Sequence, residues 1–385
     1  MARTTLFRQS FASISAGSFL DGYDVVVCPN CGFVYADDLP SQREFDEHYR
    51  CMSKYEYQDQ GGIESQLELG RYRRIAGFVR RICPSPDTRI LDVGCSTGGL
   101  LAVLKEHGYK NLQGLDPSSN CAQAAKRLYG IEVTTGAIDD CHLPAGSFDL
   151  LILLGVLEHL RDLRPILARL REFLSSKGLA LICVPDATRF AQEDDAPFQQ
   201  FSTEHVNFFS PASLTNLMVN AGFDPVACEQ NEFRDGKGFT QVGPVVDAAF
   251  RKALTSGTRW SRDGESERAL VQYIRKSEKI DSDVRRTIDT IIAAGKPILV
   301  WGAGTHTLRL LATSRLREAT IAAFVDSNPR YQGKDVNGIP ILAPADVAGR
   351  SEAILVSSRV YQEDIARQIR EKLRLPNQVF TLYDL

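Results

Sequence analysis

The sequence lacks the features that direct a chain to a membrane, to secretion or to a polyanion. Its longest clean apolar run, Leu150–Leu157, is far short of the roughly 20 residues that a membrane helix needs. Small polar residues surround Arg3 and Arg8, without the sustained apolar stretch of a secretory signal. The 45 basic and 48 acidic side chains leave a net charge of -3, so no basic field attracts nucleic acid or anionic lipid. We therefore expect a cytoplasmic protein with neither partner.

A disulfide framework is also missing. Nine cysteines, an odd number, are scattered over 385 residues, which favours free thiols in a reducing compartment and at most one metal cluster. The chain is 43% hydrophobic and 24% charged, as is usual for a globular protein. At roughly one domain per 150 residues, its length predicts two or three domains.

Cys28 and Cys31 form half of a zinc-ribbon pattern. Two thiolates on a tight turn can share a tetrahedral zinc ion, but such a site needs four ligands. A second C-x-x-C motif is missing, and Cys51 has only His48 near it in the sequence. Two explanations stay open for the missing half: the chain starts inside a longer gene product, or the site has decayed. The alternative to bound zinc is a metal-free turn with two thiols.

The hydrophobic pattern divides the chain into four parts. Residues 1–60 are expected to form a small irregular segment. Over residues 61–230, short apolar runs alternate with helical stretches, which predicts an α/β fold with a parallel sheet. We interpret residues 231–292 as a connecting region with a long amphipathic helix from Ser266 to Ile292. A second, smaller α/β unit is expected over residues 293–385.

The strongest motif follows the first strand of the second part. Ile90–Gly99 runs from an apolar strand through a glycine-rich turn into a helix. Glycines allow close approach of a ligand to the backbone, and a helix N-terminus offers free N–H groups. Leu112–Asp116 places an acid at the end of the next strand, where a carboxylate can accept both hydroxyls of a ribose. A dinucleotide-binding domain is the alternative, but the loop lacks the G-x-G-x-x-G spacing.

Two further motifs follow in order: Gly136–Asp139, and a fourth strand that leads into Gly155–His159. This ordered set resembles the class I S-adenosylmethionine-dependent methyltransferases over about residues 64–227. The resemblance implies a Rossmann-like core and S-adenosylmethionine as cofactor. Asp116 would hold the ribose hydroxyls, and Asp92 would orient the loop and the amino group. The implied cofactor-binding residues are Asp92, Gly94, Cys95, Gly98, Asp116, Pro117 and Ile138.

Methyl transfer to a carbon or a hydroxyl needs a base, and two histidines are candidates. His159 follows Glu158 at the end of the fourth strand, the edge that faces the ligand crevice in open α/β sheets. His205 follows Glu204 in an aromatic-rich loop that suits a substrate lid. Histidine titrates near neutral pH and therefore suits proton transfer. The structural alternatives are that His159 braces the site and that His205 caps or packs under the aromatics.

A closer resemblance covers nearly the whole chain. It rests on a C-x-x-C-G segment, the methyltransferase core, the Glu204-His205 loop before an F-S-P-x-S-L stretch, and a C-terminal unit that opens with Val300–Gly304. This order is similar to that of the sugar C-methyltransferases, which act on nucleotide-linked 4-keto-deoxysugars. The resemblance implies that His205 removes the proton alpha to the ketone, beside Glu204 and the second histidine His159. The enolate would then attack the cofactor's methyl group.

The sequence departs from this family at Ser202, where the family carries a tyrosine. A tyrosine from the N-terminal part is expected near the sugar, and Tyr55 and Tyr57 are both candidates. With Ser202 they make up the predicted substrate-binding set. The expected partner is a nucleotide sugar, and the expected state is a monomer or a homodimer. Methylation of a hydroxyl on a sugar or saccharide, and a non-catalytic protein with this fold, stay open.

The last part contains a second glycine loop. Gly302–Gly304 follows a strand, and Asp326 ends the next one. This order could indicate a nicotinamide site, but Thr307 occupies the third glycine position. The resemblance implies instead a cofactor-free Rossmann-like lobe that closes the substrate cleft.

Overall fold

The computed structural model describes residues 3–15, 20–51, 64–233, 243–253, 261–329 and 331–383. Its largest sheet belongs to the predicted methyltransferase part and has the strand order β10-β11-β8-β7-β4-β5-β6. The strands from β8 to β6 run parallel, and β11 and β10 add an antiparallel edge. The strands are β4 (Arg89–Val93), β5 (Asn111–Asp116), β6 (Val133–Thr135), β7 (Phe148–Leu154), β8 (Leu174–Pro185), β10 (Phe223–Phe233) and β11 (Gly243–Lys252).

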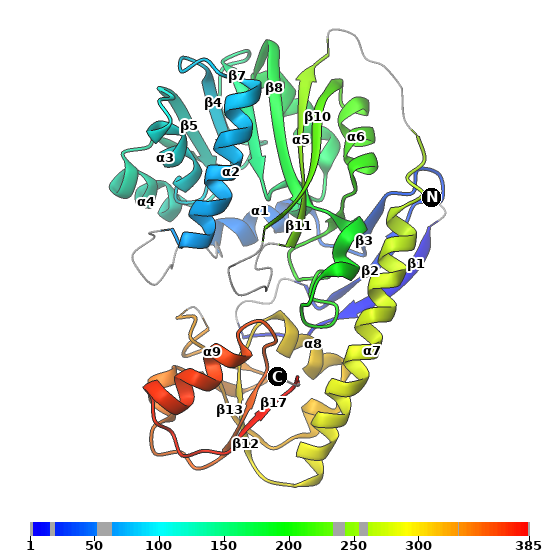
Figure 1. Ribbon diagram of the computed structural model, residues 1–385, viewed down its shortest axis with the longest axis vertical. Coiled ribbons are helices and arrows are strands. Elements are labelled where there is room, and N and C mark those ends of the chain that lie inside the picture. The colour runs from blue at the N-terminus through cyan, green and yellow to red at the C-terminus, as the bar shows by residue number, and fades with distance from the viewer. Residues whose placement is uncertain are drawn as a thin grey trace.

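Helices cover both faces of this sheet (Figure 1). Apolar side chains of the first three helices pack against one face, and those of the last two pack against the other. The helices are α2 (Gln66–Ile82), α3 (Gly99–Glu106), α4 (Ser119–Tyr129), α5 (Leu163–Phe173) and α6 (Pro211–Asn220). This arrangement confirms the predicted Rossmann-like core.

The predicted domain boundary at residue 230 needs correction, because it falls inside β10. β11, which we assigned to the connecting region, pairs with β8 and is buried from Gly243 to Phe250. It is a nearly continuous apolar run, as expected of a strand that has neighbours on both sides and is covered on both faces. The sheet therefore extends well beyond the predicted core.

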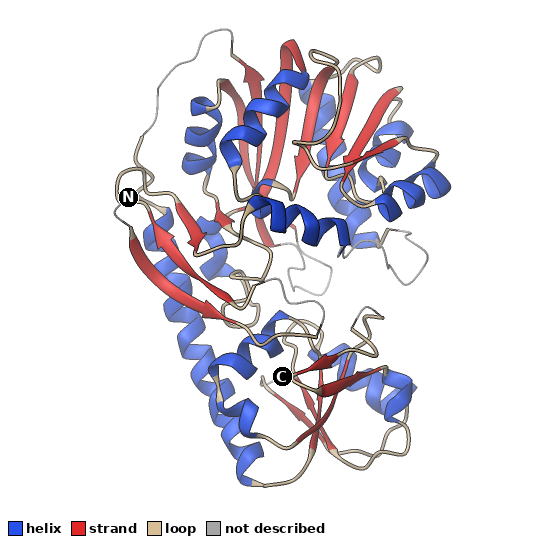
Figure 2. Cartoon of the chain, turned by 180° about the vertical axis from the view of Figure 1, so that it is seen from behind, coloured by secondary structure: helices blue, strands red, loops and turns tan. Residues whose placement is uncertain are grey.

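The prediction of an irregular N-terminal segment is wrong, because this segment forms regular strands and a helix. It forms β1 (Thr4–Ser10), β2 (Gly22–Val27) and β3 (Val34–Asp37), and α1 (Gln42–Cys51) follows. These strands make an antiparallel sheet whose last member is β9 (Asn207–Phe208). Figure 2 shows these strands between the two α/β units. A local pattern could not reveal the last pairing of this sheet, because β9 lies far from β3 in the sequence.

The C-terminal unit is a second sheet with the strand order β14-β15-β13-β12-β16-β17, parallel except for β14. The predicted long helix is α7 (Ser266–Ala293), which runs along one side of the molecule to this sheet (Figure 1). The strands are β12 (Ile298–Trp301), β13 (Ile321–Val325), β14 (Asp335–Val336), β15 (Ile339–Leu342), β16 (Ala353–Val356) and β17 (Val379–Thr381). The helices of this unit include α8 (Thr305–Thr313) and α9 (Gln362–Arg367). Among the helices of the described ranges, none is long and apolar enough to cross a bilayer.

The two α/β units hold their glycine loops in the same way. In each, an acid at the end of the second strand accepts a backbone N–H from the loop after the first strand. Asp116 Oδ2 accepts from Ser96 N at 2.8 Å, and Asp326 Oδ2 accepts from Ala303 N at 2.8 Å. The second unit is therefore Rossmann-like in its loop as well as in its sheet, as predicted.

Candidate active site

The glycine loop after β4 has the conformation that the sequence predicts. Gly94 and Gly98 have φ angles of +70° and +81°, which L side chains rarely adopt. Gly98 is also the residue that caps α3. A Cβ at Gly94 would lie 2.7 Å from Cγ2 of Val156, so this loop packs directly against the segment after β7.

Asp92, at the end of β4, provides a test of whether the loop fits the expected cofactor. Its side chain is buried, and Oδ1 has no hydrogen-bond partner among the described residues. Burial, with the charge of Asp116 as a second cause, raises the pKa of Asp92 to about 8. The Ser96 hydroxyl is likewise buried without a described partner. A buried carboxylate oxygen and a hydroxyl beside an open glycine loop fit a ligand with a cationic amino group and polar substituents.

Asp116 lies where the sequence predicts, at the carboxyl end of β5. It is buried and accepts hydrogen bonds from the backbone N–H groups of Ser96 (2.8 Å) and Ser118 (2.9 Å). These bonds fix the carboxylate against the glycine loop. Pro117, the next residue, is half-buried and begins the turn into α4.

Cys95 and Ile138 belong to the apolar interior as well as to the predicted cofactor set. The Cys95 thiol fills the space that a Cβ at Gly114 would need, so its side chain points toward β5. Burial is the largest cause that raises the pKa of this thiol well above its usual value. Ile138 is buried in the cluster that contains Cys141. Only the backbone of Cys95 is therefore placed to line the loop.

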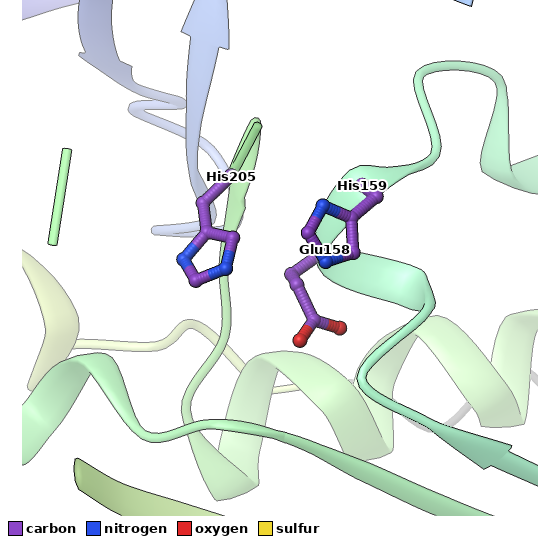
Figure 3. A group of neighbouring side chains, drawn as sticks. All are labelled: Glu158, His159 and His205. Carbon is purple, nitrogen blue, oxygen red and sulfur yellow. The ribbon is translucent and has the colours of Figure 1, made fainter. Parts of the chain in front are cut away.

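Three chemically active side chains converge beyond the end of β7. Glu158 and His159 belong to the short helix η2 (Leu157–His159), and His205 comes from the loop before β9. One ligand atom from each lies within 4.8 Å of the other two. The two imidazole rings meet edge to face with centroids 5.0 Å apart. Figure 3 shows a ring nitrogen of His205 facing His159, with the Glu158 carboxylate beside both rings.

Hydrogen bonds lock the two segments that carry this cluster. Asn207 Nδ2 donates to the carbonyl groups of Leu157 (2.9 Å), the first residue of η2, and Leu160 (2.7 Å), the residue after it. The backbone N–H of Val206 donates to the carbonyl of Glu158 at 2.8 Å. The two histidines are thus held in place by the backbone of both segments.

The contacts of His159 define its tautomer. Its Nδ1 lies 3.0 Å from the carbonyl oxygen of Glu204 and 3.1 Å from the hydroxyl of Tyr49. A carbonyl oxygen only accepts, so Nδ1 carries the proton of the neutral ring. The lone pair of His159 is therefore on Nε2.

The structure brings together only part of the predicted catalytic and substrate set. His159 and His205 meet, but Glu204 contributes its carbonyl oxygen, and the carboxylate of the cluster is that of Glu158. Ser202 Oγ accepts from the N–H groups of Glu204 (3.3 Å) and His205 (3.2 Å), so it shapes the loop. The predicted Tyr55 and Tyr57 lie outside the described residues.

Sequence reasoning missed two residues of this site. Glu158 was noted only as the neighbour of His159, although an acid at the end of a parallel strand is itself a signal. Tyr49 lies on α1, and its hydroxyl reaches His159 across 110 positions of sequence. No spacing rule links α1 to η2, so the contact required the tertiary structure.

The predicted zinc half-site forms a knuckle. Cys28 N donates to the Phe33 carbonyl at 2.9 Å, and Gly32 N donates back to the Cys28 carbonyl at 2.8 Å. Hydrogen bonding to the backbone of Cys31 lowers the pKa of Cys28, whereas burial raises the pKa of Cys31. In the described ranges, the cluster of Glu158, His159 and His205 is the only group of three or more metal-ligating side chains. Zinc at Cys28 and Cys31 therefore stays a prediction.

Comparison with known proteins agrees with this geometry. Residues 67–227 match the family described as a methyltransferase domain, and residues 295–378 match one described as C2185-like, N-terminal. The first match covers the parallel strands of the large sheet, the glycine loop and both histidine-bearing segments. The chain carries a class I methyltransferase domain and is an S-adenosylmethionine-dependent methyltransferase.

Its relatives include the C-methyltransferase NovU of Streptomyces niveus. The two are 25% identical over 346 residues, which cover 87% of this chain and 79% of NovU. A probable S-adenosylmethionine-dependent methyltransferase of Mycobacterium tuberculosis is 25% identical over 238 residues, 59% of this chain and 84% of the relative. Among solved structures, the 1,6-didemethyltoxoflavin-N1-methyltransferase of Burkholderia thailandensis matches with 18% identity and a TM-score of 0.43, over 59% of this chain and 97% of that one.

Proposed function

We propose that this methyltransferase transfers a methyl group to carbon, on a nucleotide-linked 4-keto-deoxysugar, through an enolate. The observation that carries the proposal is the cluster of His159, His205 and Glu158 beside the cofactor loop. The cluster follows β7, and the segment that leads to it packs on Gly94. A base in this position lies at the carboxyl edge of the parallel sheet, where ligands of such folds bind.

The proposed reaction needs one base and no oxidant. His205 takes the proton from the carbon alpha to the ketone, and the electron pair of that C–H bond forms the enolate. The enolate carbon attacks the methyl group, so a C–C bond forms while the C–S bond breaks. The products are S-adenosylhomocysteine, the methylated ketone and a protonated His205, which returns its proton to water. The Glu158 carboxylate stabilises the imidazolium that forms in the meantime.

The choice of acceptor rests on similarity rather than on a visible substrate pocket. The relative called a C-methyltransferase aligns with 87% of this chain, far more than residues 67–227 alone. The resemblance to sugar C-methyltransferases is the basis for proposing a nucleotide sugar as the acceptor.

The described chain contains no disulfide, and its thiols support the proposal of a reducing, cytoplasmic location.

The acceptor can be tested by mass spectrometry. Nucleotide-linked 4-keto-6-deoxysugars and their 4-hydroxy counterparts are incubated with protein and S-adenosylmethionine. Parallel reactions in heavy water contain S-adenosylhomocysteine instead, so that the enolate forms without methyl transfer. We expect one added methyl group on keto sugars only, and deuterium alpha to the ketone in the parallel reactions. Methylation of hydroxy sugars without exchange would replace this proposal with O-methylation.

Replacement of the base is the sharper test. His205→Asn keeps a polar side chain of similar size but cannot take up a proton at neutral pH. We expect turnover to fall by about 10²–10⁴-fold, with nearly unchanged affinity for S-adenosylmethionine in calorimetry. His107→Asn is the matched control, because this histidine lies at the end of α3, where Nδ1 contacts the carbonyl of Val103. Full activity of His205→Asn would remove the base assignment.

A further inference from the structure

We propose that Glu158, His159 and His205 bind one divalent transition-metal ion of the zinc class, and that the bound ion occupies the lone pair His205 needs for proton transfer. The metal site stands on its own geometry. The effect on turnover rests on the proposed function, in which His205 is the base.

The donor set suits this class of ion. Two imidazole nitrogens and one carboxylate oxygen are the protein ligands of several catalytic zinc sites, which keep a further position open. Imidazole favours zinc and its neighbours in the first transition series over magnesium or calcium, which prefer oxygen ligands. The ion expected here is therefore zinc, or cobalt as its spectroscopic substitute.

The spacing is close to what an ion requires. Three atoms that all lie within 4.8 Å of one another fit within about 2.8 Å of a common point. Zinc binds nitrogen and oxygen at about 2.0–2.2 Å, so each ligand atom has to move by less than about 0.8 Å. Small changes of side-chain torsion supply such a shift without moving the backbone.

The surroundings orient the ligands in the way that metal sites use. The contact of His159 Nδ1 with the Glu204 carbonyl at 3.0 Å leaves the lone pair on Nε2. A metal-binding histidine usually donates its other N–H to a carbonyl or carboxylate, which fixes ring and tautomer. The bond from Val206 N to the Glu158 carbonyl ties the segments of His205 and Glu158 together. The ligands therefore come from two segments that are already locked.

Charge favours a cation but limits its affinity. Glu158 is only 3% exposed, and a divalent ion compensates a carboxylate in such a position better than water can. A Cβ at Gly155 would lie 3.1 Å from Arg71 Nη2 and 3.5 Å from Glu158 Oε1, so a guanidinium lies in the same region. We therefore expect weaker binding than in a closed structural zinc site.

The test uses Co²⁺ with the full chain, purified in the presence of a chelator that is then removed. Cys28 and Cys31 are a second place where this ion can bind, so the titration is made in a Cys28→Ser/Cys31→Ser background. Calorimetry gives affinity and stoichiometry, and absorption spectra report the ligand type. We expect one ion per chain, with no charge-transfer band from thiolate to cobalt.

Ligand variants decide the location. Glu158→Gln and His205→Ala should each weaken cobalt binding by more than about 100-fold, beyond the range typical of outer partners of metal ligands. His107→Ala, at a histidine whose Nδ1 contacts the carbonyl of Val103 at the end of α3, should bind cobalt as the parent does. Absence of saturable binding, or equal affinity in Glu158→Gln, would overturn the site.

Turnover separates this inference from the proposed function. We expect added Co²⁺ or Zn²⁺ to suppress methyl transfer in proportion to occupancy, and a chelator to restore it. If cobalt binds as described and turnover rises instead, the ligand assignment holds. The claim that the ion blocks the base then fails, together with the assignment of His205 as that base.

Discussion

At the residue scale, Asp92 links cofactor binding to pH. Its pKa is raised to about 8 in the ligand-free chain, and the resemblance places the cofactor's cationic amino group against it. A cation binds the ionised carboxylate, so below pH 8 binding must first release a proton. The association constant for S-adenosylmethionine should then fall as the pH drops below about 8. It should also fall above about pH 8, where the α-amino group of the cofactor loses its own proton. Calorimetry over the range from about pH 6 to 9, in buffers of different ionisation enthalpy, measures both the affinity and the released proton.

The control for this prediction is Asp92→Asn, which cannot ionise. We expect it to bind more weakly at pH 8 and to lose the fall in affinity toward low pH, while Ser96 and the glycine loop remain in place. An affinity of the native chain that is constant across the range would show that this carboxylate does not titrate on binding.

The residues of the site differ in how far sequence could predict them. Asp92 and Asp116 could be predicted from the sequence, because each lies at the end of a strand in a motif with fixed order, and the structure places both at the glycine loop. Glu158 and Tyr49 could not be predicted, because their roles depend on the turn at η2 and on a helix more than a hundred residues away. Periodicity predicts which face of an element is buried, but it does not predict which distant side chains meet.

At the scale of elements, a buried ion pair joins α7 to α8. Asp281 and Arg309 are almost fully buried and form a salt bridge, and Arg285 adds a second contact to Asp281 at 2.6 Å. Asp281→Asn leaves the guanidinium of Arg309 without its full counter-charge in a place that water does not reach. We expect the free energy of unfolding to fall by about 3–5 kcal/mol, measured by urea denaturation.

The same helix offers the control. Asp283 and Arg286 form an exposed pair three residues apart, and Asp283→Asn should cost less than about 1 kcal/mol. Equal effects of the two substitutions would mean that burial does not strengthen the pair of Asp281 and Arg309.

Elements such as α7 were predictable from their long periodic pattern, whereas β9, with two residues, was not, since its pairing with β3 is what makes it a strand.

At the scale of the whole molecule, the hydrophobic cores do not follow the four predicted parts. One cluster runs through the N-terminal strands, the segment after β8, α7 and the C-terminal sheet, and includes Val25, Phe201, Ile288 and Val300. Two other clusters belong to the two faces of the methyltransferase sheet. The N-terminal sheet therefore shares its core with the C-terminal unit, although the two are at opposite ends of the sequence.

This division predicts two unfolding transitions in calorimetry, only one of which depends on the cofactor product. S-adenosylhomocysteine should raise the midpoint temperature at which the methyltransferase sheet unfolds, because it binds only the folded state. Phe198 stacks on Phe7 with centroids 4.3 Å apart, lies under the Arg309 guanidinium at 4.6 Å, and donates its backbone N–H to Ser277 Oγ. Phe198→Ala should lower the midpoint temperature of the other transition, because removal of a large aromatic from a core costs about 3–5 kcal/mol of stability. Phe173→Ala should instead lower the midpoint temperature of the transition that the product stabilises. A single transition that the product and both variants shift together would show that the clusters unfold as one.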